Sequence, residues 1–172
     1  PFVYRFYPPV RETRARIASS DERVWLAHGH YLQDWLAEQS SYNWRVDDGA
    51  SRAFSDIGVH WCDLFEFATG HRIERLIAQR PRLHDTRLSE DGEVPVSTED
   101  GVTMMFQTDR GATGSVVISQ ATPGRKNRLW LSIDGEQHSY AFDQESPNEL
   151  WIGSNEGVSL LPKGVETFGD AA

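Results

Sequence analysis

Residues 50–68 have the sequence Ala-Ser-Arg-Ala-Phe-Ser-Asp-Ile-Gly-Val-His-Trp-Cys-Asp-Leu-Phe-Glu-Phe-Ala, and their apolar side chains recur every three or four positions. This is the spacing of one face of an α-helix. The apolar positions are Ala50, Ala53, Phe54, Ile57, Trp61, Leu64, Phe65 and Ala68. Thr69-Gly70 follows, and a glycine commonly ends a helix at such a point. The spacing therefore predicts one long helix with a single buried face.

The segments around this helix alternate between two kinds of side chain, which is the pattern of β-strands. Residues 24–32 form one such segment before the helix. After the helix the sequence predicts strands at 73–78, 102–108, 113–121, 127–134, 137–143 and 150–153, with a polar loop at 84–101. Short turn sequences such as Asp109-Arg110-Gly111 link them, so consecutive strands should pair antiparallel. We predict an α+β fold: a large, mostly antiparallel, open-faced sheet with helices packed on one face.

The first residues of the chain show a different pattern. Residues 2–7, Phe-Val-Tyr-Arg-Phe-Tyr, alternate and favour a strand, and Pro8-Pro9 before residues 10–18 predicts a helix that begins with prolines. A strand at the first residues needs neighbouring strands from elsewhere. We therefore expect the sequence to begin inside a larger protein.

Composition limits the classes of function. The chain of 172 residues has 17 basic and 26 acidic side chains and a net charge of −9, which repels nucleic acid and anionic membrane surfaces. It contains no apolar run near the about 18 residues of a membrane-spanning helix and no signal-peptide pattern. Cys62 is the only cysteine and fits a reducing compartment. We predict a cytoplasmic protein with neither nucleic acid nor membrane as a partner.

Asp56 and His60 lie one helical turn apart, just past the edge of the apolar stripe. A carboxylate beside an imidazole can hold one tautomer and stabilise the imidazolium, which suits proton transfer. The same spacing also fits an ordinary helix pair worth roughly a few tenths of a kcal/mol. Spacing alone leaves both interpretations open.

Other polar residues are weaker candidates. Gln33 at the end of the first long strand could contact a substrate or cap the strand, and Trp44 and Arg45 before the helix could stack on and bond a polyol or anchor a loop. His28 and His30 point to the same face of a strand, as metal ligands would, but no Cys/His cluster of metal spacing accompanies them. We predict no metal site.

Residues 44–70 resemble the signature helix of the glucose-fructose oxidoreductase and inositol dehydrogenase family (Gfo/Idh/MocA). Three further stretches agree with this resemblance, which covers most of the chain. They are His-Gly-His-Tyr-Leu-Gln-Asp-Trp at 28–35, Gly-Arg-Lys-Asn at 124–127 and Asp-Gln-Glu-Ser-Pro-Asn-Glu-Leu at 143–150.

The resemblance implies a nicotinamide-dependent dehydrogenase of sugars, polyols or related compounds. Such enzymes have a Rossmann domain followed by an open-faced sheet domain, like the C-terminal domain of dihydrodipicolinate reductase. The family's catalytic aspartate and histidine map onto Asp56 and His60, and the histidine commonly takes the hydroxyl proton while hydride leaves for the nicotinamide. The open sheet face is the usual dimer interface, which implies a homo-oligomer with Trp130 and Tyr140 as interface aromatics.

The sequence lacks the cofactor half of that family. It has no Gly-x-Gly-x-x-Gly after a strand and no Glu-Lys-Pro motif. We expect residues 1–20 to be the last strand and helix of a missing Rossmann domain, which would bind NAD or NADP, and residues 21–172 to be the substrate-binding and oligomerisation domain. The alternative is a non-catalytic small-molecule-binding or scaffold module of the same fold.

Overall fold

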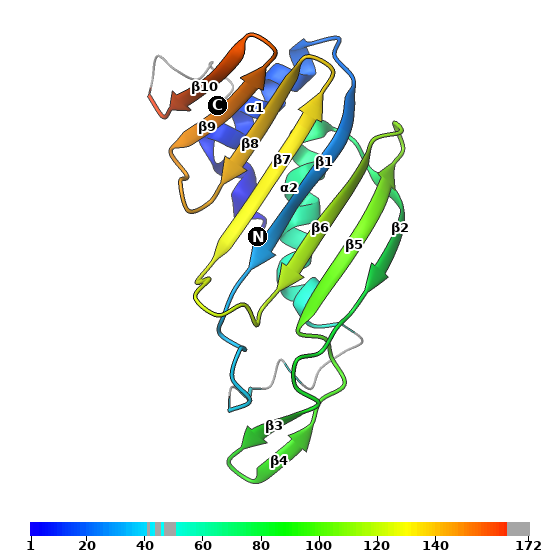
Figure 1. The fold of residues 1–172 in the computed structure, drawn as a ribbon, viewed down its shortest axis with the longest axis vertical. Helices are drawn as coiled ribbons and strands as arrows, with labels where there is room; N and C mark the ends of the chain where they lie inside the picture. The colour runs from blue at the N-terminus through cyan, green and yellow to red at the C-terminus, as the bar shows by residue number, and fades with distance from the viewer. Residues whose placement is uncertain (41, 44–45, 47–50, 165–172) are drawn as a thin grey trace.

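A large mixed sheet forms the body of the molecule, and α1 and α2 cover one of its faces (Figure 1). The computed structural model describes residues 1–40, 42–43, 46 and 51–164. Its helical elements are the 3₁₀-helix η1 (Val3–Phe6), α1 (Pro8–Ser19), the π-helix η3 (Phe54–Gly58) and α2 (Val59–Thr69). Its strands are β1 (Val24–Leu32), β2 (Ile73–Gln79), β3 (Thr86–Ser89), β4 (Gly92–Pro95), β5 (Gly101–Thr108), β6 (Thr113–Ser119), β7 (Arg128–Gly135), β8 (His138–Asp143), β9 (Glu149–Ser154) and β10 (Gly157–Pro162).

The order of strands in the large sheet is β10-β9-β8-β7-β1-β6-β5-β2. β1 lies in the centre, antiparallel to β7 and parallel to β6, while the other neighbouring strands of this sheet pair antiparallel. β3 and β4 form a separate hairpin that projects from one end of the sheet (Figure 1). The parallel pairing of β1 with β6 brings the ends of both strands to the same edge.

The core lies between the sheet and α2. Trp61 and Phe65 of α2 are completely buried, and their rings stack with centroids 5.8 Å apart. The Trp61 indole donates to the carbonyl of Trp130 over 2.9 Å, across Gly29 of β1. A Cβ at position 29 would lie 2.6 Å from the indole nitrogen and 2.2 Å from that carbonyl oxygen, so this close approach requires glycine.

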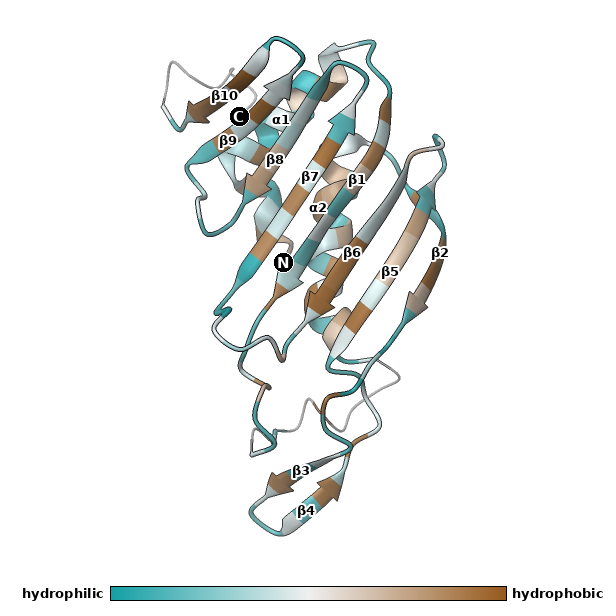
Figure 2. Cartoon of the chain, in the orientation of Figure 1, coloured by the Kyte–Doolittle hydropathy of each residue, from teal (hydrophilic) through white to brown (hydrophobic). Residues whose placement is uncertain are grey.

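Alternation along the strands separates the two faces of the sheet. In β5 and β6 every second residue is buried under the helices, including Met104, Phe106, Val116 and Ile118. Figure 2 shows hydrophobic and more hydrophilic residues alternating along β7. This pattern confirms the predicted α+β fold with a mostly antiparallel sheet and helices on one face.

Three predictions about the elements were wrong. Residues 2–7 do not form a strand, because η1 satisfies its backbone locally, as in the bond from the Tyr7 amide to the Tyr4 carbonyl (3.3 Å), and no strand among the described residues pairs with it. Residues 84–101 are not only a loop, since they contain the β3–β4 hairpin. β10 was missed at the end of the sheet, where it pairs with β9.

The long helix also differs from the prediction at its start. Phe54–Gly58 form a π-helical turn before α2 begins. A π-turn holds more residues than an α-turn, so the angle between successive side chains is smaller there. Gly70 ends α2 with φ of +71°, as the sequence predicted. Position 50, the first of the predicted helix, lies outside the described residues.

Candidate active site

The predicted catalytic pair lies at the edge of the sheet where β1 and β6 end. Asp56 comes from η3 and His60 from the first turn of α2, and both are partly exposed. Within the described part of the chain, no hydrogen bond or ion pair joins the two side chains. The π-turn explains this, because it shifts Asp56 away from the position that a regular i,i+4 spacing would give it.

Asp56 is bound instead by a residue at the end of β6. The amide nitrogen Nε2 of Gln120 donates to Asp56 Oδ2 over 2.7 Å. Gln120 is completely buried, and its own Oε1 accepts from Arg52 Nη1 over 3.2 Å. Sequence reasoning missed Gln120, although it follows Val116 and Ile118 at period 2 and so continues the buried face of its strand.

The imidazole of His60 is held by aromatic rings. Its centroid lies 5.7 Å from that of Tyr4 and 5.4 Å from that of Phe2, both in edge-on geometry. His60 Nδ1 is buried and has no hydrogen-bond partner among the described residues. The ring is therefore fixed by packing, and the side chain remains partly exposed for a ligand.

A closed network of hydrogen bonds supports the aromatic side of the site. The hydroxyls of Tyr4 and Tyr31 are 2.6 Å apart, and Tyr31 donates to Asn127 Oδ1 over 2.8 Å. Gln33 Nε2 donates to the same oxygen over 2.7 Å, and Trp35 Nε1 donates to Gln33 Oε1 over 2.8 Å. Burial, followed by the Tyr4 hydroxyl, raises the pKa of Tyr31, so this phenol stays protonated. Both polar ends of Gln33 thus have partners inside the chain.

The basic stretch at 125–127 is tied to neighbouring acids. Lys126 Nζ donates to Asp34 over 2.6 Å, and this hydrogen bond, opposed by burial, lowers the pKa of Asp34. Arg125 pairs with Glu145 at 3.3 Å. Trp44 and Arg45, the other predicted substrate contacts, lie outside the described residues.

Comparison with known proteins identifies the family of the chain. A family model described as the GFO/IDH/MocA C-terminal domain matches residues 11–141. The chain belongs to this family. The family predicted from the residues around the long helix is therefore confirmed. No curated protein matches the chain.

Solved GFO/IDH/MocA-like structures share the fold. An oxidoreductase domain protein from Kribbella flavida is 28% identical with a TM-score of 0.85, over 92% of this chain and 46% of that one. Levoglucosan dehydrogenase in complex with NADH and L-sorbose is 28% identical with a TM-score of 0.87, over 95% of this chain and 46% of that one. An inositol dehydrogenase homolog from Azotobacter vinelandii, complexed with NADH and myo-inositol, has a TM-score of 0.84 at 21% identity, over 99% of this chain and 44% of that one, and shows the fold alone.

The chain spans less than half the length of these structures. None of the helices in the described residues is long and apolar enough to cross a membrane.

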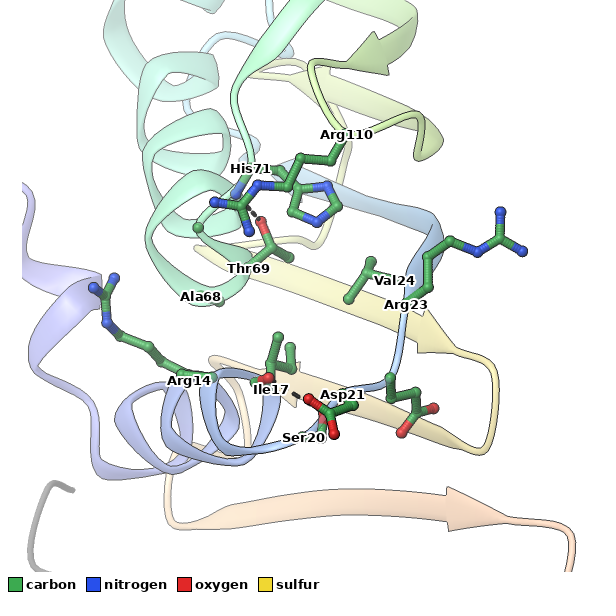
Figure 3. Close-up of a pocket in the computed structure, with 13 residues that line it drawn as sticks. Arg14, Ile17, Ser20, Asp21, Arg23, Val24, Ala68, Thr69, His71 and Arg110 are labelled. Carbon is green, nitrogen blue, oxygen red and sulfur yellow. Dashed lines mark hydrogen bonds between the residues drawn. The ribbon is translucent and has the colours of Figure 1, made fainter.

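The pocket in Figure 3, of about 490 Å³, lies at the other end of this GFO/IDH/MocA domain. It is lined by the last residues of α1 and α2 and the first of β1, whereas His60 lies in the first turn of α2. Arg14 Nη1 donates to the Phe67 carbonyl over 2.5 Å, and its guanidinium lies 4.4 Å from the centroid of the Phe67 ring. Basic side chains stabilise the carbonyls of helix C-termini. The pocket contains none of the predicted site residues, and we assign Arg14 there to helix capping.

The surroundings of His28, His30 and Cys62 bear on two other kinds of site, a metal site and a nucleophilic thiol. His28 and His30 lie on the open face beside Trp130, with ring centroids 5.1 and 5.5 Å from it. Among the described residues, no three His, Cys, Asp or Glu side chains are grouped to hold a metal ion. Burial, with smaller contributions from nearby acids, raises the pKa of the Cys62 thiol to about 12, so it is protonated at neutral pH and unsuited to nucleophilic attack.

Proposed function

We propose that this chain is the substrate-binding and assembly half of an NAD- or NADP-dependent dehydrogenase that oxidises a hydroxyl of a sugar, polyol or related compound in the cytoplasm. The proposal rests on one observation: the packed, partly exposed imidazole of His60 and the partly exposed carboxylate of Asp56 lie at the same edge of the sheet. Membership of the GFO/IDH/MocA family and the likeness to levoglucosan dehydrogenase, solved with NADH and levoglucosan, support it.

His60 takes the role of general base in this proposal. It accepts the proton of the substrate hydroxyl, while Tyr4 and Phe2 keep its ring in place. Asp56 accepts a hydrogen bond from a substrate hydroxyl through Oδ1, since Gln120 occupies Oδ2. Gln33, Trp44 and Arg45 are the proposed further substrate-binding residues.

The cofactor belongs to a different domain in this proposal. Dinucleotide phosphates bind where a glycine-rich turn leads from a strand into a helix N-terminus. Among the described residues, the glycines with positive φ end α2, lie between strands or begin a strand, and none leads from a strand into a helix: Gly70, Gly92, Gly111, Gly124 and Gly157. The described residues therefore do not fit the dinucleotide. Residues 1–20 are the proposed end of a Rossmann domain, and residues 21–172 are the proposed second domain. A nicotinamide held by the Rossmann domain would be the hydride acceptor.

Titration with NADH and NADPH tests this division of labour. The six tryptophans of the chain serve as fluorescence donors. We expect no saturable quenching of the 172-residue chain up to millimolar cofactor, and saturable quenching together with polyol-dependent nicotinamide reduction once the chain is joined to its cofactor domain. Saturable binding to the chain alone would contradict the division. Cofactor binding without oxidation of any sugar or polyol would favour the non-catalytic alternative.

The open face of the sheet is the proposed assembly surface. A row of side chains in register crosses this face from β2 to β10. Its members are Ile77, Met105, Ser115, His28, Ser132, Ala141, Trp151 and Leu160. Ile77 and Met105, which pair across β2 and β5, are 72% and 65% exposed, and Leu160 at the other end of the row is 61% exposed; contiguous apolar surface of this kind marks interaction sites. Tyr140, which the sequence placed at this surface, is instead buried on the helix side.

Met105→Glu tests the assembly surface. A second copy would bury this side chain near the middle of β5, so a carboxylate there should raise the dissociation constant of the oligomer by about 10-fold or more, measured by sedimentation velocity. The matched control is Leu88→Glu in the β3–β4 hairpin, where an exposed leucine lies off this face. A wild-type chain that sediments as a monomer at every concentration would refute the surface.

A further inference from the structure

We infer that Gln120 is the positioning residue that aims the Asp56 carboxylate, and that Arg52 determines which way the Gln120 amide points. This inference rests on the proposed function, in which Asp56 binds a substrate hydroxyl. It assigns the substrate contact to one oxygen of Asp56. The orientation of the Asp56 carboxylate then depends on a buried series of hydrogen bonds.

Gln120 has no freedom to turn away from the site. Its backbone N–H donates to the Asp100 carbonyl over 3.0 Å, and its carbonyl accepts from the Leu36 amide over 3.0 Å. The side chain is completely buried, and a buried amide is stable only when its polar atoms have partners. The two partners are Arg52 on one side and Asp56 on the other.

The chemistry of these partners fixes the direction of the amide. A guanidinium has donors only, so the side of Gln120 that faces Arg52 Nη1 must be the oxygen Oε1, which lies 3.2 Å from it. Nε2 is then turned toward Asp56 Oδ2, at 2.7 Å. The opposite orientation would set an NH₂ against the guanidinium and an oxygen against a carboxylate. Both contacts would be repulsive, so only one orientation is stable.

Arg52 is itself held by buried groups. Its Nη2 donates to the Glu99 carbonyl over 2.6 Å and to Asp100 Oδ1 over 2.5 Å, and its side chain is only 2% exposed. Asp100 Oδ1 also accepts from Arg87 Nη2 over 2.6 Å. Hydrogen bonds therefore run without a break from the buried ion cluster to the site, through Asp100, Arg52, Gln120 and Asp56.

The result is a carboxylate with two unlike oxygens. Asp56 Oδ2 is occupied by the Gln120 amide, whereas no residue within the described part of the chain bonds Oδ1. The charge-assisted bond from the amide holds Oδ2 toward Gln120, so Oδ1 is the oxygen left for another donor. The geometry points to Oδ1 as the atom that receives the substrate hydroxyl.

The first test needs no catalysis and uses the 172-residue chain. The side-chain amide signal of Gln120 is followed by ¹⁵N NMR in wild type, in Asp56→Asn and in Thr98→Val. Thr98 is a buried residue whose hydroxyl donates to the Val46 carbonyl, outside the series Asp100, Arg52, Gln120 and Asp56. We expect the Gln120 NH₂ signal to shift clearly in Asp56→Asn, because a charged acceptor is replaced by a neutral one, and to stay in place in Thr98→Val. An unchanged signal in Asp56→Asn would overturn the inference.

The second test uses the complete enzyme and Gln120→Glu. This change keeps the acceptor for Arg52 but replaces the NH₂ by an oxygen, so two carboxyl groups face each other and share a proton. We expect kcat/KM for the substrate to fall about 10-fold or more below wild type at neutral pH, mainly through KM, and the ratio to wild type to rise toward acidic pH, whereas Thr98→Val keeps the wild-type pH profile. A wild-type pH profile in folded Gln120→Glu would overturn the inference. A wild-type enzyme that oxidises no polyol would instead refute the proposed function, and the NMR result would stand apart from it.

Discussion

Replacing His60 with alanine should lower the turnover of the complete dehydrogenase by about 100-fold or more, with a much smaller change in KM. The reason is that the imidazole is the proposed acceptor of the hydroxyl proton, and its ring packs on Tyr4 and Phe2 at 5.7 and 5.4 Å between centroids. Removing it takes away the base and leaves the hydrogen-bond network of Tyr4 and Tyr31 intact. Steady-state kinetics with saturating cofactor measures the effect.

The matched control for this experiment is His138→Gln. His138 is the first residue of β8, at the end of the sheet opposite to Asn127, and its Nδ1 pairs with Glu22 at 3.0 Å. We expect wild-type turnover in this control. Turnover in His60→Ala within a few-fold of wild type would exclude His60 as the base and leave the site to another residue.

Replacing Asp100 with alanine should lower the free energy of unfolding by about 3 to 5 kcal/mol, the usual effect of breaking a buried charge pair. Asp100 is 4% exposed, and it accepts hydrogen bonds from Arg52, Arg87 and the Leu83 amide. In this variant the guanidinium groups of Arg52 and Arg87 stay buried but lose the carboxylate that they share. Since a domain is stable by only about 5 to 15 kcal/mol, urea denaturation will show the change clearly.

The control is Glu136→Ala, which breaks the pair between Arg23 and Glu136. This pair has side chains 67% and 50% exposed at 3.2 Å, and such surface pairs contribute about 0 to 1 kcal/mol. If Asp100→Ala destabilised the chain no more than this control, the buried cluster would have no role in stability.

The buried cluster of Asp100, Arg52 and Arg87 also makes the free energy of unfolding depend on pH. Burial raises the pKa of Asp100, but the Leu83 amide, Arg87 and Arg52 outweigh it and hold this pKa below its usual value. A carboxyl with a depressed pKa in the folded state stabilises the fold above its unfolded pKa, which is about 3.9. We expect this contribution to be complete at neutral pH and to be lost as pH falls below about 4, with a smaller loss in Asp100→Ala.

The fold was largely predictable because its signals are local. The apolar spacing from Ile57 to Ala68 and the alternation in β5 to β8 follow directly from burial on one face. The spacing of apolar residues does not distinguish the π-turn from an α-turn, although the Phe54 ring packs so closely on Gly58 that a Cβ there would lie 2.5 Å from it. The amide groups of Arg52 and Phe54 at this turn bond to Glu99, more than 40 positions along the chain.

Spacing and resemblance predict Asp56 and His60 as site residues, and their catalytic role stays a prediction. The side chains that contact them come from distant segments, Gln120 for Asp56 and Tyr4 for His60, and could not be predicted. Arg87 illustrates the difficulty. It lies in a segment that the sequence predicted as a polar loop, yet its side chain is completely buried and donates to Asp100. No pattern of neighbouring residues signals that burial.

The central place of β1 has a consequence for how the chain reaches its native state. Residues 24–32 pair with residues 113–119 and 128–135, so this strand has neither neighbour until most of the chain has been synthesised. The hairpins of β5 with β6 and of β7 with β8 join segments close in sequence and can form first. We expect β1 to close the sheet last, by inserting between the two hairpins. Loop closure over about a hundred residues should make this the slow step, and before it the unpaired edges of β6 and β7 would be exposed to association with other chains.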